Sequence, residues 1–149
     1  MQLVVGGDHA GFALKGPIVA ALREWGHTVH DVGAHTPDPV DFPDVARDLC
    51  LEIQSGRAER GIMVCGTGVG AAIAANKMAG IRGAVCHDVY SAHQCVEHDD
   101  VNVLCLGAQI VGDRLAMDLV RTYLAAEFSS APEFRRRVAK LAELERTVR

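Results

Sequence analysis

The segment from Ile62 to Lys77 constrains this chain more than any other part of its sequence. It begins with a short apolar run, passes through three glycines at alternate positions (66, 68 and 70) and continues as alanine-rich sequence. This order predicts a buried strand, a tight glycine turn and the start of a helix. Such a turn directs several backbone N–H groups into one hollow at the positive end of the helix dipole. The segment therefore predicts a place to hold negative charge, with the Cys65 thiol and the Thr67 hydroxyl at its lip.

Strands and helices are expected to alternate along the rest of the chain. Apolar and β-branched runs predict strands at 2–5, 28–32, 61–65, 82–87 and 102–106. Helical spacing predicts helices at 12–25, 43–55, 69 to about 80, 90–97 and 112–127. This alternation predicts an α/β fold with a five-stranded parallel sheet and helices on both of its faces. The length of 149 residues favours a single domain, 1–149.

The last segment, residues 131–149, differs from the repeating strand–helix units. Phe134, Val138, Leu141 and Val148 fall roughly on one stripe. The same segment carries the basic side chains of Arg135, Arg136, Arg137, Lys140 and Arg146. A helix appended after the last sheet unit needs an apolar surface to cover. We therefore expect this C-terminal helix to pack on a partner subunit and the protein to be a dimer.

Charge and hydropathy exclude several classes of protein. The net charge of −4 argues against a nucleic-acid binder, which would normally carry a basic surplus. Apolar runs are too short for a membrane span, and the N-terminus lacks the layout of a signal peptide, so a cytoplasmic protein without membrane contact is expected. The five cysteines are odd in number and form no C-x-x-C pair, so they are expected to be mostly reduced and buried.

Chemically active side chains gather where predicted strands end. In parallel α/β sheets, ligands bind at the carboxyl ends of the strands. We expect the following side chains to meet there: Asp8, His9, Cys65, Thr67, His87, Asp88, His98, Asp99 and Asp100. A thiol, a hydroxyl, imidazoles and carboxylates around one anion hollow suit acid–base catalysis with a developing oxyanion.

Each of these residues also has a simpler interpretation. Cys65 at a strand end is either a packing residue or a thiol activated by the positive field of the glycine turn. His9 follows an aspartate in a tight turn, where it either caps the turn or binds a ligand. His98 lies among acids, where a solvated histidine is the alternative. His87, His93 and His98 lack an H-x-x-x-H spacing, so we expect no metal.

A nucleotide-binding or regulatory module is the rival interpretation of the glycine turn. The spacing Gly66-x-Gly68-x-x-Ala71, with Asp88 about twenty residues further on, matches the dinucleotide-binding fingerprint. Two features weigh against it. The motif follows the third predicted strand, whereas the fingerprint follows the first, and the chain leaves no room for a separate substrate domain.

Several blocks, read in order along nearly the whole chain, closely resemble the ribose-5-phosphate isomerase B family, which also includes the galactose-6-phosphate isomerase subunits. These blocks are Gly7–Phe12 with Leu14 and Lys15, Cys65–Gly70, Ile73–Lys77, Gly80–Arg82 and Asn102–Leu104. The resemblance implies a three-layer Rossmann-like fold, a homodimer or homotetramer with shared active sites, and no metal or cofactor. It also implies interconversion of an aldose phosphate and a ketose phosphate through a cis-enediolate.

The resemblance also implies a role for individual residues. Cys65 would move the proton between C1 and C2, while Thr67 and His98 would assist ring opening. Asp8 would bind or orient sugar hydroxyls, and His9 and Arg137 would help to hold the phosphate. The backbone that would hold the enediolate oxygens belongs to Gly66, Gly68, Val69, Gly70 and Ala71.

Four positions depart from the family pattern. Asp99 stands where the family usually has Asn, Gln109 and Glu133 stand where two arginines are usual, and Phe42 replaces a common tyrosine. Loss of two guanidinium groups weakens capture of a phosphate dianion. Conversion of ribose 5-phosphate to ribulose 5-phosphate is expected first. The alternatives are an isomerase of an unphosphorylated sugar or of a tetrose or hexose phosphate, and a non-catalytic paralogue.

Overall fold

The computed structural model describes residues 1–147. Five strands and six helices form over this range, and they alternate as predicted up to the fifth helix. The strands are β1 (Gln2–Gly7), β2 (Thr28–Gly33), β3 (Arg60–Cys65), β4 (Gly83–Val85) and β5 (Val103–Gly107). The helices are α1 (Phe12–Glu24), α2 (Phe42–Gln54), α3 (Val69–Ala75), α4 (Val89–Asp99), α5 (Asp113–Ala125) and α6 (Pro132–Thr147).

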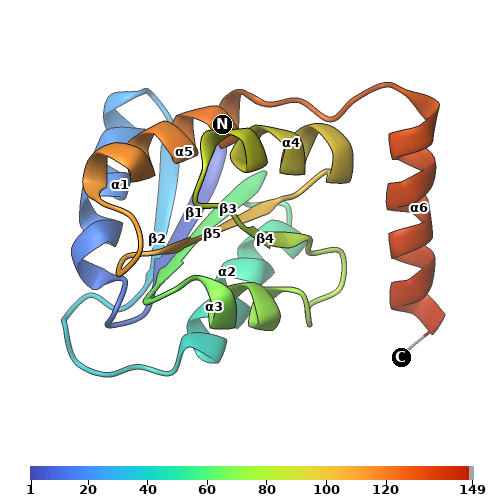
Figure 1. The fold of residues 1–149 in the computed structure, drawn as a ribbon. Coiled ribbons are helices and arrows are strands. Elements are labelled where there is room, and N and C mark those ends of the chain that lie inside the picture. The colour runs from blue at the N-terminus through green and yellow to red at the C-terminus, as the bar shows by residue number, and fades with distance from the viewer. Residues whose placement is uncertain (148–149) are drawn as a thin grey trace.

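The strands form one parallel sheet in the order β2-β1-β3-β5-β4, which confirms the predicted α/β fold (Figure 1). After β1 the chain moves to one side, to β2, and then crosses to the other side, to β3. Such a reversal of strand order opens a crevice at the carboxyl ends of the two strands beside it. Asp8, which follows β1, and Cys65, which ends β3, therefore flank the crevice where an α/β sheet binds its ligands.

Alternate residues of each strand face opposite layers of helices. In β3, Ile62 and Val64 belong to the core formed with α1, α4 and α5, whereas Met63 and Cys65 belong to the core formed with α2 and α3. This is the two-residue period of a strand buried on both faces. The period turns the Cys65 side chain toward α3, the helix that follows the glycine turn.

The third helix and the fourth strand are clearly shorter than predicted. The helix after the glycine turn ends at Ala75 and does not reach Gly80, because the Asn76 side chain bonds both the N–H and the carbonyl of Gly83, at 2.8 Å each. These bonds fold the chain back toward β4. That strand covers only residues 83–85 of the predicted 82–87, because the chain turns away into α4.

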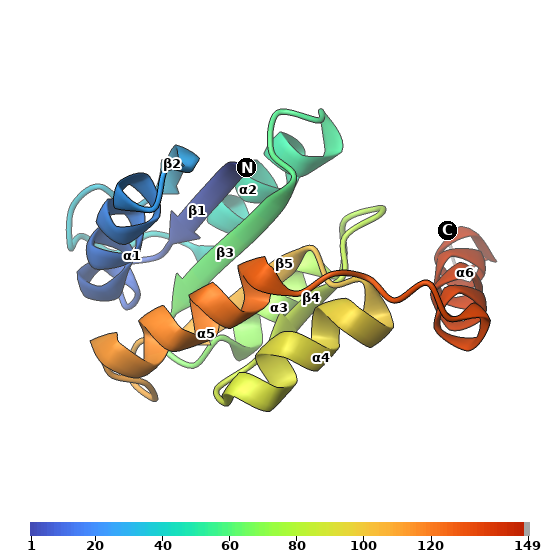
Figure 2. The ribbon, with the colours of Figure 1, turned by 90° about the horizontal axis from the view of Figure 1, so that it is seen from above.

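The C-terminal helix α6 stands apart from the sheet (Figure 2). An irregular segment, residues 126–131, joins it to α5, and the helix has no buried residue between Pro132 and Thr147. The Glu145 carboxylate accepts hydrogen bonds from the N–H of Gly80 at 2.9 and 3.1 Å. A groove of about 720 Å³ separates the predicted apolar stripe of α6, including Val138 and Leu141, from the α3–β4 region. Val148, the last member of that stripe, lies outside the described residues.

Candidate active site

The glycine turn after β3 brings backbone donors to the Cys65 sulfur. Gly68 has a φ of +81°, a left-handed conformation in which a side chain would be strained. In this conformation its N–H donates to Cys65 Sγ at 3.0 Å. An N–H donor directed at sulfur stabilises a negative charge there. The first amides of α3, such as that of Gly70, have no acceptor within the helix and are available to an anion.

Cys65 is 5% exposed, and its side chain lies at the junction of the sheet and the glycine turn. All five cysteines are free and buried, as the sequence predicted. Burial raises the pKa of Cys50 to about 11. Burial, with a smaller contribution from neighbouring thiols, raises the pKa of Cys105 further still. These two thiols stay neutral and serve packing. Cys65 has a contact of another kind, the N–H of Gly68 that donates to its sulfur.

Two predicted residues follow β1 at the same edge of the sheet. Asp8 is 6% exposed, and its Oδ1 accepts a hydrogen bond from the N–H of Gly11 at 2.9 Å. His9 is exposed, and its Nδ1 accepts from the N–H of Val40 at 3.3 Å, so a neutral His9 ring carries its proton on Nε2. The imidazole thus ties the β1 loop to the segment that precedes α2.

Two of the departures from the family pattern cover the glycine turn. The Gln109 carboxamide packs over Gly66: a Cβ placed on that glycine would lie 3.1 Å from Gln109 Oε1. The Phe42 ring packs over Gly70 in the same way, with Cζ 3.0 Å from the position of a Cβ. Both side chains therefore lie against the anion hollow. The Thr67 side chain is exposed beside them, and its Oγ1 accepts from the N–H of Val69 at 3.4 Å.

A second group of predicted site residues gathers around α6. The His98 ring stacks on Phe134 with centroids 4.0 Å apart, and the Arg137 guanidinium lies 5.5 Å from the same Phe134 ring. Arg137 and Glu133 are exposed on the first turns of α6. Asp99 ends α4 and lines the groove beside α6. This second group therefore offers one imidazole, one guanidinium and two carboxylates, whereas the Cys65 thiol belongs to the first group.

The expectation that His98 and Asp99 join Cys65 at the carboxyl edge was wrong for a single chain. Helix α4 starts at that edge, after β4, and returns to the opposite edge, where Asp99 precedes β5. Cys65 pairs with Gly107, the last residue of β5. The length of β5, roughly 13 Å at 3.3 Å per residue, therefore separates the two groups. The same geometry places His87 and His98 at opposite ends of α4.

The sequence predicted the position of His87 at the carboxyl edge but assigned it no role. His87 was expected near the carboxyl edge, and its Nε2 accepts a hydrogen bond from the N–H of Gly107 at 2.9 Å. Its position directly after the fourth strand was the available signal. Phe134 was assigned only to the apolar stripe of the last helix, but it forms the stacking surface for His98.

Across residues 1–147, we find no helix with the length and apolar character needed to cross a membrane.

Comparison with known proteins agrees with this geometry. The family model described as Ribose/Galactose Isomerase matches residues 3–141. Ribose-5-phosphate isomerase B of Escherichia coli is 44% identical over 127 residues, 85% of each chain. D-erythrulose-4-phosphate isomerase of Pectobacterium atrosepticum is 40% identical over 140 residues, 89% of this chain and 90% of the relative. The solved structure of Clostridium thermocellum ribose-5-phosphate isomerase B covers 100% of both chains at 43% identity, with a TM-score of 0.98. This chain therefore belongs to the ribose/galactose isomerase family and is a sugar-phosphate isomerase.

Proposed function

We propose that this protein interconverts an aldose phosphate and a ketose phosphate, with ribose 5-phosphate and ribulose 5-phosphate as the first candidate pair. The observation that carries the proposal is the placement of Cys65 Sγ, 3.0 Å from a backbone N–H of the glycine turn. In this reaction Cys65 removes the proton from C2 of the aldose and returns it to C1. The intermediate is a cis-enediolate, whose two oxygens lie against the amides of residues 66–71.

The energetics explain why a thiol and a ring of amides suffice. A proton next to a carbonyl is a weak acid, and most of the barrier lies in the negative charge that develops on oxygen. Oriented donors lower this barrier, and loss of one such donor typically costs about 3 kcal/mol. Thr67, which is exposed beside the turn, is proposed to assist ring opening, and Asp8 to hold a sugar hydroxyl. His9 is proposed to contact the phosphate.

We propose further that a complete site needs two subunits. Within residues 1–147, the contacts around Cys65 include no guanidinium, and those around His98 and Arg137 include neither the thiol nor the glycine turn. Each chain carries both groups at opposite edges, so a symmetric dimer would pair them twice. Exposed apolar side chains on α3, such as Ile73, and the half-exposed stripe of α6 support a homodimer, which could pair again into a tetramer.

A tetrose phosphate is the second candidate substrate. One relative at 40% identity is a D-erythrulose-4-phosphate isomerase, so family membership does not determine the sugar. Gln109 and Glu133 supply no guanidinium to the phosphate, which leaves Arg137 from the family set. Gln109 lies over Gly66 and is suited to hydrogen bonding with a sugar oxygen. The same replacements keep an unphosphorylated sugar among the alternatives.

A panel of substrates tests the proposal. The purified protein would be assayed with ribose 5-phosphate, erythrulose 4-phosphate, galactose 6-phosphate and the matching unphosphorylated sugars. We expect the highest kcat/KM on ribose 5-phosphate, and no turnover of any sugar by Cys65→Ala. A preference for erythrulose 4-phosphate would favour the second candidate, and equal turnover of free sugars would contradict a phosphate substrate. Retained turnover by Cys65→Ala would refute the assigned base.

A further inference from the structure

The ladder of hydrogen bonds between β4 and β5 ends two residues before Gly107, the residue of β5 that lies beside the glycine turn. Its last strand pair is Val85 with Cys105, followed by one long bond of 3.4 Å from the N–H of Cys86. Beyond it the chain turns into α4, with Asp88 as N-cap. The N–H of Gly107 would lose its partner at this point. The His87 side chain replaces the missing strand, because its Nε2 accepts this N–H at 2.9 Å.

Gly107 is packed directly against the glycine turn. A Cβ on Gly107 would lie 2.7 Å from both the Cα and the carbonyl carbon of Thr67, so the two backbones touch. The next two amides continue this contact. The N–H of Ala108 donates to the carbonyl of Cys65 at 2.8 Å, and that of Gln109 donates to the carbonyl of Gly66 at 3.0 Å. The turn is thus held in place by the segment that starts at Gly107.

His87 holds the start of that segment from the other side. Its ring is partly buried, and acceptance of the Gly107 N–H requires an unprotonated Nε2. A neutral ring then carries its proton on Nδ1. The ring therefore acts as a fixed acceptor. Gly107 lies between it and Thr67 of the glycine turn.

We propose that His87 is a positioning residue for the isomerisation. It fixes Gly107, and through Gly107 it fixes the turn whose amides stabilise the enediolate. This inference rests on the function proposed above, because the turn matters for rate only if it holds an oxyanion. A displacement of a fraction of an ångström in such donors lowers the rate of the chemical step more than it weakens substrate binding.

Three substitutions of one residue test the role. His87→Ala removes the acceptor, and we expect kcat to fall about tenfold while KM changes by less than about twofold. His87→Gln can place Oε1 near the position of Nε2, and we expect kcat to return to within about threefold of wild type. His87→Asn is one methylene shorter and should remain as slow as His87→Ala. The matched control is His93→Ala on α4, whose ring is half exposed and pairs with Glu97, and its kcat should equal that of wild type.

Hydrogen exchange at the Gly107 amide separates this proposal from the proposed function. Exchange should be slow in wild type and in His87→Gln, and faster in His87→Ala, even if no sugar is turned over. Thermal unfolding of each variant shows that the kinetics come from folded protein. Wild-type kcat in His87→Ala, a purely KM effect, failure of His87→Gln to recover, or unchanged Gly107 exchange would each overturn the role of His87.

Discussion

Gly107 is the residue at which two segments of the candidate site meet. A Cβ at this position would lie 2.7 Å from Thr67 backbone atoms, a separation that real Cβ atoms do not show. Any side chain must therefore push the Thr67–Gly68 turn away from β5. Gly112, five residues further along, has no atom within 4 Å of its Cβ position and has an ordinary φ of −84°. Alanine substitutions at Gly107 and at Gly112 therefore separate the effect of this close contact from a general effect of replacing a glycine.

We expect Gly107→Ala to lower kcat about a hundredfold, because the turn amides would shift relative to the oxygens of the proposed enediolate. Its free energy of unfolding should fall by about 1–3 kcal/mol, the usual cost of overpacking. Gly112→Ala should keep the wild-type kcat. Steady-state kinetics and urea unfolding of both variants provide the measurement. Wild-type kcat in Gly107→Ala would contradict the role given to this contact.

Single residues show what a sequence pattern can and cannot reveal about a site. The alternate glycines predicted the turn, and Cys65 was placed correctly because a strand end has a defined edge. The contact of Gln109 with Gly66 and the bond from Gly107 to His87 could not be predicted. Both join segments far apart in the sequence, and they depend on side-chain direction, which spacing does not encode.

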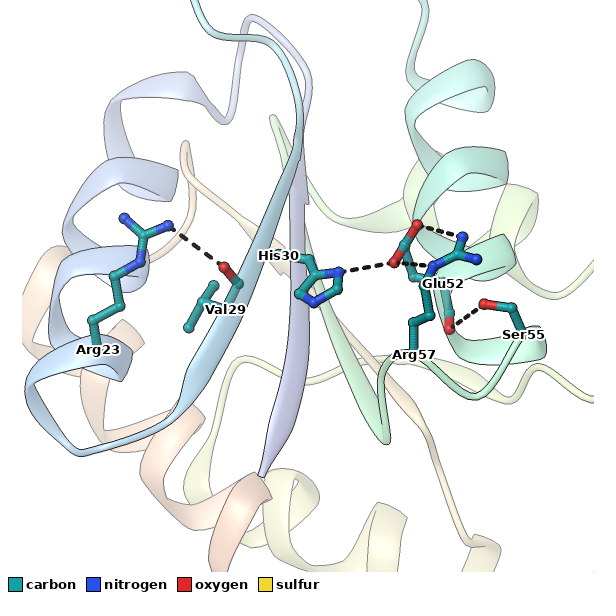
Figure 3. A network of polar contacts seen from close by, with 6 residues as sticks. All are labelled: Arg23, Val29, His30, Glu52, Ser55 and Arg57. Carbon is teal, nitrogen blue, oxygen red and sulfur yellow. Dashed lines mark hydrogen bonds and ion pairs between the residues drawn. The ribbon is translucent and has the colours of Figure 1, made fainter.

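Among the secondary-structure elements, β2 and α2 are tied together by a polar network around Glu52 (Figure 3). His30 Nδ1 lies 2.9 Å from Glu52 Oε2, and Arg57 donates to both carboxylate oxygens, from Nε at 2.9 Å and from Nη2 at 2.7 Å. The Glu52 side chain is 17% exposed. The pKa of Glu52 is lowered from 4.5 to about 2. The hydrogen bond from Arg57 is the main cause, and the hydrogen bond from His30 contributes less.

The sign of this shift determines how the network depends on pH. A carboxyl with a lowered pKa in the folded state stabilises the fold above its unfolded pKa, and this contribution is lost as pH falls from about 4.5 to about 2. We expect Glu52→Gln to lower the free energy of unfolding by about 1 kcal/mol at pH 7. The difference from wild type should shrink below pH 4. Urea unfolding at pH 7, 5, 4 and 3 measures it.

Asp48→Asn on the same helix is the control, because Asp48 is 53% exposed in its pair with Arg47. Its effect should be smaller than that of Glu52→Gln at pH 7, since exposed pairs contribute little. Equal effects of the two substitutions at pH 7, or a Glu52→Gln effect as large at pH 3 as at pH 7, would contradict a stabilising contribution from the ionised Glu52 carboxylate.

Element types were predictable because their periods are local, whereas some element ends were not. Five apolar runs separated by helical patterns indicated a parallel sheet, and the structure has one. The end of α3 depends on two hydrogen bonds between the Asn76 side chain and Gly83. The early end of β4 depends on the turn into α4. These are contacts across turns, and they override the alanine-rich and β-branched runs that set the predicted ends.

At the scale of the whole molecule, the separation of the site residues is the main result. His98 and Asp99 were expected at the edge that carries Cys65, although they precede β5 and therefore lie where that strand begins. Because α4 crosses the full length of the sheet, its two ends lie at opposite edges. His98 then stacks on Phe134 of α6, and the Arg137 guanidinium of the same helix lies near that ring. The predicted parallel sheet already implied this crossing, because a helix between two parallel strands returns the chain to the edge where the next strand begins.

Hybrid dimers decide whether the two groups act together. We expect Cys65→Ala and His98→Ala each to be inactive as homodimers. When the two variants are co-expressed with different tags and the hybrid is purified through both, one of its two sites contains both substitutions and the other contains neither. A site shared between subunits then gives about half of the wild-type activity per dimer. If each chain instead formed its own site, every site in the hybrid would lack either the thiol or the imidazole, and the hybrid would be as inactive as its parents.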